Sequence, residues 1–321
     1  MTNVALLGSF GDVGGGPLVF RNKLINGGMA VDQRNAGATQ TFTAAAALAY
    51  SVDRWYGYCT GANATGARVA GTGAQYAYRF TGAASVTAIG FAQRIEQVNA
   101  YSLAGQTATL SVDLANSLLT TVTWTAYYAN TADTFGSLAS PTKTSIATGT
   151  FTVTSTVTRY QAQITVPAAA TTGIEILFTV GAQTSGTWTI QNAQLEAGSS
   201  STPFEQRLVG MELILCQRYC QVFSFVSGGI IGFVDSTTTS LHYWMFQVPL
   251  RSTAISCSSS GSFEIRRGGV ASSVVTALTF ETSNNFTTRF LVTSSSLTIG
   301  QAVALTSASA AVVSLTASSE L

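Results

Sequence analysis

Charged residues are scarce in this chain. Lys, Arg, Asp and Glu make up 9% of its 321 residues, whereas ordinary soluble domains contain roughly 25%. The formal net charge is +1, and Lys and Arg form no cluster, so the sequence offers no electrostatic surface for nucleic acid or anionic lipid. Ser, Thr, Ala, Gly and Gln replace the charges, which predicts a polar, uncharged surface or burial within a larger particle.

Several patterns that would carry chemistry are also missing. No run of about 18 apolar residues is present, so we expect no membrane insertion. The four cysteines include no CxxC pair, which favours a reduced protein made in the cytosol. The single histidine, His242, lies in the alternating stretch LHYWMFQVPL and is interpreted as a packed strand residue rather than a catalytic base. Because no HExxH, GxSxG or GxxxxGK[ST] string occurs, we expect no catalytic residue, cofactor or metal.

Acidic residues leave one catalytic alternative open. A glycosidase needs two carboxylates that flank the bond to be cleaved, and the chain has 14 acids. We expect a protein that is not an enzyme, with a glycan depolymerase-like enzyme as the alternative. The acids inside or next to predicted strands are isolated in the sequence, and nothing pairs them: Asp53, Glu96, Asp113, Glu175 and Asp235.

Alternating apolar and polar residues dominate the chain and predict a mainly β protein. Residues 107–114, for example, place four apolar residues on one side and four polar ones on the other, as a half-buried strand does. Such stretches recur with short polar loops, which indicates a jelly-roll-like antiparallel sandwich over residues 21–200. After a single helix, residues 223–321 predict a smaller β domain. Further strands are expected at 122–128, 160–166, 174–180, 224–233, 241–248, 262–266, 274–280, 286–292 and 312–317.

The first twenty residues lack a domain pattern. They contain GDVGGGP, which is the composition of a flexible tether, and no Lys or Arg precedes their apolar patch as in an export signal. We interpret residues 1–20 as an attachment arm.

The one convincing helix is expected over 207–221, after a linker that begins at residue 201. A helix that covers one sheet needs an apolar stripe of roughly 100°, but here two stripes lie side by side and cover more than half of the circumference. The surplus predicts that copies of the helix meet in an oligomer, and the pattern alone does not separate a trimer from a dimer. The first stripe contains Leu208, Met211, Leu215 and Tyr219, and the second contains Val209, Leu213, Cys216 and Cys220.

Glu212 is the discordant residue of this helix, because it lies inside the apolar arc. A carboxylate there is costly unless it is paired. Arg207, Arg218 or Arg251 could neutralise it, or it could face a solvent channel along an oligomer axis. The predicted oligomerisation residues are therefore Leu208, Met211, Glu212, Leu215 and Tyr219.

Aromatic residues offer a way to bind sugar without charge. In DRWYGYC, alternation places Trp55 on one face of a strand and Tyr56 and Tyr58 on the other. We expect Trp55 to fill the sandwich core and the tyrosines to cover its outside. The alternative is a sugar platform, for which Tyr56, Tyr58 and Tyr127 are the candidate glycan contacts.

Five segments together resemble the tail-fibre and appendage proteins of tailed bacteriophages. NKLINGGMAVDQRNAG (22–37), YSVDRW (50–55) and IQNAQLEAGSSSTPFEQR (190–207) are similar to the β-sandwich domain of these proteins. ELILCQRYC (212–220) and FQVPLRSTAIS (246–256) are similar to the segment that follows it. One departure is Cys220, where the family commonly has Tyr. The predicted sandwich also resembles carbohydrate-binding modules in its fold.

The resemblance implies a virion structural protein that is made in the cytoplasm of the bacterial host and assembles as a homotrimer. It implies that the N-terminal arm docks on other virion proteins while the β domains project toward host-surface glycan. A capsid decoration or fibre protein is the alternative within the same family.

Overall fold

The computed structural model describes residues 20–44, 48–227, 229–268, 270–308 and 311–321. The fold is mainly β, with 51% of residues in strands and 7% in helices, and the strand pairs are antiparallel. This confirms the predicted fold class. Two compact units are present, residues 1–212 with Leu321 and residues 213–320. The predicted attachment arm, apart from Phe20, lies outside the described residues.

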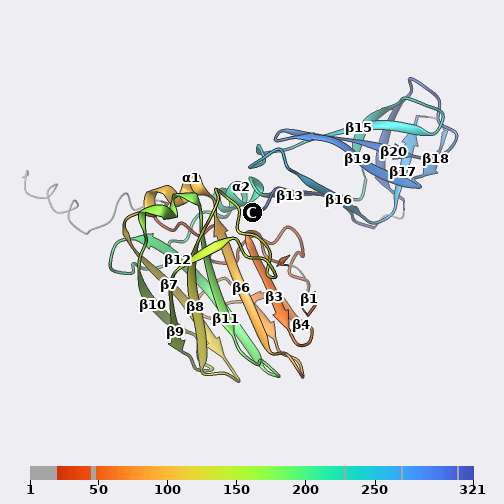
Figure 1. Ribbon diagram of the computed structural model, residues 1–321. Coiled ribbons are helices and arrows are strands. Elements are labelled where there is room, and N and C mark those ends of the chain that lie inside the picture. The colour runs from red at the N-terminus through yellow and green to blue at the C-terminus, as the bar shows by residue number, and fades with distance from the viewer. Residues whose placement is uncertain (1–19, 45–47, 228, 269, 309–310) are drawn as a thin grey trace, which may run out of the picture. The chain divides into compact units, whose positions relative to one another are not determined.

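The first unit is a sandwich of two six-stranded sheets (Figure 1). In spatial order, the first sheet contains β1 (Gln40–Phe42), β4 (Ala64–Ala70), β5 (Tyr76–Thr81), β12 (Thr187–Ala197), β7 (Thr107–Asn116) and β10 (Thr158–Thr165). The second contains β2 (Ala49–Tyr50), β3 (Trp55–Thr60), β6 (Ala88–Ile95), β11 (Ile174–Val180), β8 (Thr121–Ala129) and β9 (Lys143–Thr152).

The sandwich core lies between the two sheets and follows the alternation of the strands. Trp55 is fully buried, and its ring stacks on Phe91 with centroids 5.0 Å apart. Phe91 also stacks on Tyr78 at 4.9 Å, so rings from both sheets fill the centre. The four apolar residues predicted to lie on one side of residues 107–114 are fully buried in the same core: Ala108, Leu110, Val112 and Leu114.

Helices are few and short. A single turn, α1 (Gln97–Ala100), and two 3₁₀ turns, Tyr101–Leu103 and Ala168–Thr172, lie in the sandwich unit. The predicted helix is α2 (Val209–Gln217), which is shorter than expected because Cys220 already begins strand β13. Among the described residues, no helix combines the length and the apolar character needed to cross a membrane.

The second unit contains a three-stranded and a seven-stranded sheet. In spatial order, the smaller sheet contains β13 (Cys220–Phe225), β22 (Val313–Ser318) and β16 (Ser256–Ser260). The larger contains β18 (Val270–Val274), β17 (Phe263–Arg267), β21 (Ala302–Ser307), β14 (Ile230–Val234), β15 (Thr239–Met245), β20 (Thr287–Thr293) and β19 (Ala277–Asn284).

The stretch 224–233, which was predicted as one strand, is two strands in two sheets. The chain leaves β13 after Phe225 and enters β14 at Ile230. Gly229 makes this change of sheet possible, because a Cβ at that position would lie 1.6 Å from the Leu305 carbonyl oxygen. A side chain there would clash with the main chain of β21.

His242 is a fully buried strand residue of the second unit, as predicted. Its ring stacks on Phe290 with centroids 5.5 Å apart. Nδ1 lies 3.1 Å from the Ile230 carbonyl oxygen and Nε2 lies 3.0 Å from the Ser240 hydroxyl. Burial lowers the pKa of His242 to about 4, so the ring is neutral at pH 7, with Nδ1 donating to the carbonyl and Nε2 accepting from the hydroxyl.

Candidate functional site

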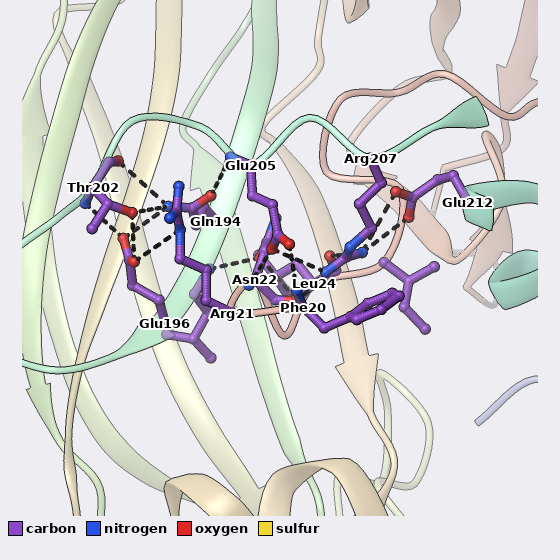
Figure 2. Close-up of polar contacts among 12 residues, drawn as sticks. Phe20, Arg21, Asn22, Leu24, Gln194, Glu196, Thr202, Glu205, Arg207 and Glu212 are labelled. Atoms are coloured by element: carbon purple, nitrogen blue, oxygen red, sulfur yellow. Dashed lines mark hydrogen bonds and ion pairs between the residues drawn. The ribbon is translucent and has the colours of Figure 1, made fainter. Parts of the chain in front are cut away.

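A short segment of the sandwich unit, residues 20–31, lies against β12 and the linker that follows it (Figure 2). Asn22 is 4% exposed and fixes this segment. Its Oδ1 accepts the N–H groups of Leu24 and Leu195, both at 3.0 Å, and its Nδ2 donates to the Ala193 carbonyl at 3.0 Å. We call the buried polar contacts within and between residues 20–31 and residues 193–212 the clasp.

Asn26 connects the clasp to the start of β3. It is fully buried with φ +57°, a left-handed conformation that Asn adopts more readily than most residues. Its Nδ2 donates to the carbonyls of Val31 and Asp53 at 2.8 and 2.9 Å. Its own carbonyl accepts Nε1–H of Trp55 at 3.0 Å. The clasp therefore joins three of the segments that carry the phage resemblance, 22–37, 50–55 and 190–207.

Glu212 is 7% exposed, and Arg207 is the partner that neutralises it (Figure 2). An η-nitrogen of Arg207 lies 3.2 Å from Glu212 Oε1, and the same oxygen accepts the main-chain N–H of Asn26. Arg207 also donates to the carbonyls of Asn22 and Leu24. Of the three predicted candidates, Arg207 is thus confirmed; Arg251 instead donates to the Ser319 carbonyl at 3.0 Å.

The other end of the clasp is built around Glu205 and Glu196. Glu205 accepts the main-chain N–H groups of Phe20 and Asn22. Glu196 accepts Gln194 Nε2 at 2.8 Å and both the N–H and the hydroxyl of Thr202, at 2.8 and 2.7 Å. These carboxylates are occupied by internal donors, so the clasp holds the linker and α2 on the sandwich rather than presenting a free acid.

The apolar surface of α2 lies partly exposed. Leu208 just before the helix is 84% exposed, and Val209, Met211 and Ile214 are 65%, 42% and 49% exposed. We call these four residues the α2 face. Of the predicted oligomerisation residues, Leu208 and Met211 belong to this face and Leu215 is half-buried. Glu212 and Tyr219 are buried, Glu212 in the clasp and Tyr219 in the second unit, so they offer no surface to another copy.

The candidate glycan contacts lie on the outer face of the second sheet of the sandwich. The ring of Tyr58 lies against Gly90, since a Cβ there would be 2.1 Å from it, and burial raises the pKa of Tyr58 to about 12. The ammonium nitrogen of Lys143 lies over the Tyr127 ring, 4.3 Å from the ring centre. Tyr56 is only 1% exposed, so of the three predicted residues only Tyr58 and Tyr127 present surface to a ligand.

Three of the isolated acids of the sandwich, Asp53, Asp113 and Glu175, have basic partners in the fold. Glu175 is fully buried between Lys143 and Arg94, whose Nε lies 2.8 Å away. Asp113 pairs with Arg159 at 3.0 Å, and Asp53 pairs with Arg34 at 3.5 Å. In the part of the chain that the structure describes, no group of three His, Cys, Asp or Glu side chains is placed to hold a metal ion.

Comparison with known proteins returns distant similarities in structure alone. No protein-family model matches the chain, and no curated protein is significantly similar in sequence. The enzymatically active domain of tailspike protein 4 from bacteriophage CBA120 is 17% identical with a TM-score of 0.37, and the match covers 56% of this chain and 22% of the tailspike chain.

Two carbohydrate-binding modules are similar at the same level. TmCBM61, solved with β-1,4-galactotriose, is 13% identical with a TM-score of 0.34, covering 56% of this chain and 99% of the module. The family 11 module of Lic26A-Cel5E from Clostridium thermocellum is 12% identical with a TM-score of 0.33, covering 52% of this chain and 99% of the module. These values do not identify a phage tail-fibre family, and any functional assignment rests on the residues of this chain.

Proposed function

We propose that this chain is a bacteriophage virion structural protein, a tail fibre or appendage, that assembles as a homotrimer through α2 and binds host-surface glycan without cleaving it. The observation that carries the proposal is the α2 face. Its four large apolar side chains lie within seven consecutive residues, 208–214, and have exposed fractions between 42% and 84%.

Assembly through α2 is supported by the way the helix is held. The clasp buries Glu212 and fixes the start of the helix on the sandwich, so Leu208, Val209 and Met211 are exposed next to an anchored residue. Exposed apolar surface of this kind is stabilised when a second copy covers it. A projecting fibre needs a symmetry axis along its length, which favours three copies, and the arm of residues 1–20 would attach the assembly to other virion proteins.

Glycan binding is supported by the tyrosines of the second sheet. Tyr58 and Tyr127 offer ring surface for a sugar, and the acids closest to them in the fold are already neutralised, as the Glu175 ion pairs illustrate. A depolymerase would need two free carboxylates on either side of a groove. We therefore propose a binding role, and a capsid decoration or fibre protein is the alternative location in the virion.

A binding experiment with host surface polysaccharide tests the glycan part of this proposal. We expect the protein to bind the polysaccharide on a sensor surface and to release no reducing ends during prolonged incubation. Replacing Tyr58 and Tyr127 by Ala together should weaken binding, whereas Tyr101→Ala, a control at a tyrosine that is 72% exposed elsewhere on the sandwich unit, should not. Release of reducing sugar would instead support the depolymerase alternative.

A further inference from the structure

A pocket of about 440 Å³ lies in the sandwich unit next to the clasp. This volume falls within the roughly 300–1,000 Å³ of small-molecule sites. Four pieces of the chain meet around it: residues 26–30, the turn between β4 and β5, the bulge of β12 and the linker that leads into α2. The residues on which the inference depends are Gly28, Gln75, Asn192, Phe204 and Gln206.

Phe204 supplies an aromatic wall. Its ring packs against Gly28, where a Cβ would lie 3.3 Å from two ring carbons. The side chain is half-buried, so it is held in place while part of the ring remains in the pocket lining. An aromatic ring in this position offers a flat apolar surface to the C–H groups of a sugar.

Three amide side chains stand around this ring with hydrogen-bonding capacity left over. Gln75 and Gln206 are exposed, and no described residue hydrogen-bonds to their side chains. Asn192 lies in the β12 bulge with φ +51°, and its Nδ2 donates to Asp113 at 2.8 Å. That bond fixes the amide and leaves Asn192 Oδ1 as an acceptor without a donor among the described residues.

The charged residues of the lining favour a neutral ligand. Glu205, Arg207 and Glu212 belong to the clasp, and each is already paired or hydrogen-bonded to main chain. Two carboxylates and one guanidinium leave the lining with an excess of negative charge, which opposes an acidic sugar or a phosphate. The free groups are therefore amides and one ring.

We propose that this pocket binds one residue of a neutral glycan, with the sugar ring against Phe204 and its hydroxyls hydrogen-bonded to Gln75, Asn192 and Gln206. The inference deepens the proposed glycan binding and depends on it, and it adds a second contact region distinct from Tyr58 and Tyr127. Leu208 and Val209 belong to both the pocket lining and the α2 face, so the assembled protein is the form to test.

Saturation-transfer NMR on the full-length assembled protein tests the pocket, with D-galactose, D-glucose and N-acetyl-D-glucosamine as neutral probes and D-glucuronate as the acidic counterpart. We expect transfer to at least one neutral sugar and none to glucuronate. Phe204→Leu keeps apolar packing on Gly28 but removes the ring, and should weaken binding about tenfold. Gln75→Ala and Gln206→Ala change exposed side chains and should each weaken it about threefold. The double Tyr58→Ala, Tyr127→Ala variant should bind these probes like the wild type.

Three results would overturn the pocket assignment: no transfer to any neutral sugar, transfer to glucuronate alone, or neutral-sugar binding that survives Phe204→Leu and both glutamine variants. If polysaccharide binding is lost only in the Tyr58 and Tyr127 variant, glycan binding stands while the pocket assignment fails. If the wild type binds neither the probes nor the host polysaccharide, both proposals fail.

Discussion

At the scale of single residues, the clasp provides partners for the buried carboxylate of Glu212. Glu212 is removed from water, which costs free energy for a carboxylate, but it receives the Asn26 N–H and the Arg207 guanidinium in return. Arg207 in turn satisfies main-chain carbonyls of the N-terminal segment. Removing Glu212 would therefore leave the buried Asn26 N–H without its acceptor and would take one carboxylate from Arg207.

Glu212→Ala tests this dependence. We expect the free energy of unfolding of the sandwich unit to fall by about 2–4 kcal/mol, because the buried Asn26 N–H loses its acceptor and the buried Arg207 guanidinium loses its nearest carboxylate. Glu281→Ala is the matched control, since Glu281 pairs with Arg289 at 2.9 Å in a solvent-exposed ion pair worth about 0–1 kcal/mol. Urea unfolding followed for each unit measures both changes, and equal losses for the two variants would contradict the account of the clasp.

His242 gives the second unit a defined dependence on pH. Its pKa is about 4 in the fold and about 6.5 in an unfolded chain, so the unfolded state binds the proton first as pH falls. The stabilising contribution of neutral His242 is complete above pH 6.5 and is lost between about 6.5 and 4, to a total of about 3 kcal/mol. The protection factors of the β14 and β15 amides, which correct the observed exchange for its intrinsic pH dependence, should fall over this range in the wild type and fall less in His242→Gln. The same pH dependence in both proteins would rule out His242 as the cause.

Residue-level contacts were only partly predictable from the sequence. The buried state of His242 followed from its alternating neighbours, and Glu212 was recognisable as a charge that needs a partner. Asn26 was not, because its role depends on a left-handed backbone and on a partner, Glu212, that is 186 positions away. The amides of Gln75 and Gln206 carried no signal, since isolated polar residues in loops are common.

At the scale of elements, α2 combines a buried end in the clasp with an exposed apolar surface. The width of the apolar pattern in the sequence indicated that the helix would have more apolar surface than one unit can cover. The pattern overestimated the length of the helix, because residues from Cys220 onward pair with β22 instead. It also did not identify Ile214 as part of the exposed apolar surface. Residues of one predicted stripe thus divide between the exposed face and the second unit.

Leu208→Asp tests the α2 face without disturbing the fold. Because Leu208 is 84% exposed, the charge should barely change the stability of one protomer, whereas in an interface it would cost several kcal/mol per copy, on the order of 2–7, if left unpaired. We expect the variant to dissociate with an unchanged circular dichroism spectrum. Ser200→Asp adds the same charge at an exposed loop position and should leave the assembly intact. Retention of the native mass by Leu208→Asp would exclude the α2 face as the interface.

Strands were predictable where apolar residues recur at every second position and unpredictable where neither face is apolar. β11 has the limits that were predicted, Ile174–Val180, because alternation and turn residues agree there. β16 has the sequence SCSSS, which contains no apolar alternation, and its strand conformation depends on pairing with β22. Pairing with β22, rather than the sequence of residues 256–260 itself, therefore determines that β16 is a strand.

At the scale of the whole molecule, the low charge content determines how any glycan would be held. Many charged side chains of the sandwich are paired with one another, and the proposed glycan contacts are aromatic rings and side-chain amides. We expect the affinity for host polysaccharide to change by less than about twofold between 50 and 500 mM salt, because screening acts on charges. Surface plasmon resonance across this range provides the measurement. Binding that disappears at moderate salt would indicate an ionic mode and contradict the proposal.

The mass of the wild-type protein in solution distinguishes a trimer held together through α2 from a dimer and from a monomer. Multi-angle light scattering at micromolar concentration should return three times the chain mass of 33.4 kDa, about 100 kDa. A stable mass near 67 kDa, twice the chain mass, would be consistent with an α2 interface between two copies but would contradict the trimer. A mass of 33.4 kDa would show a folded monomer and would contradict the assembly proposed here.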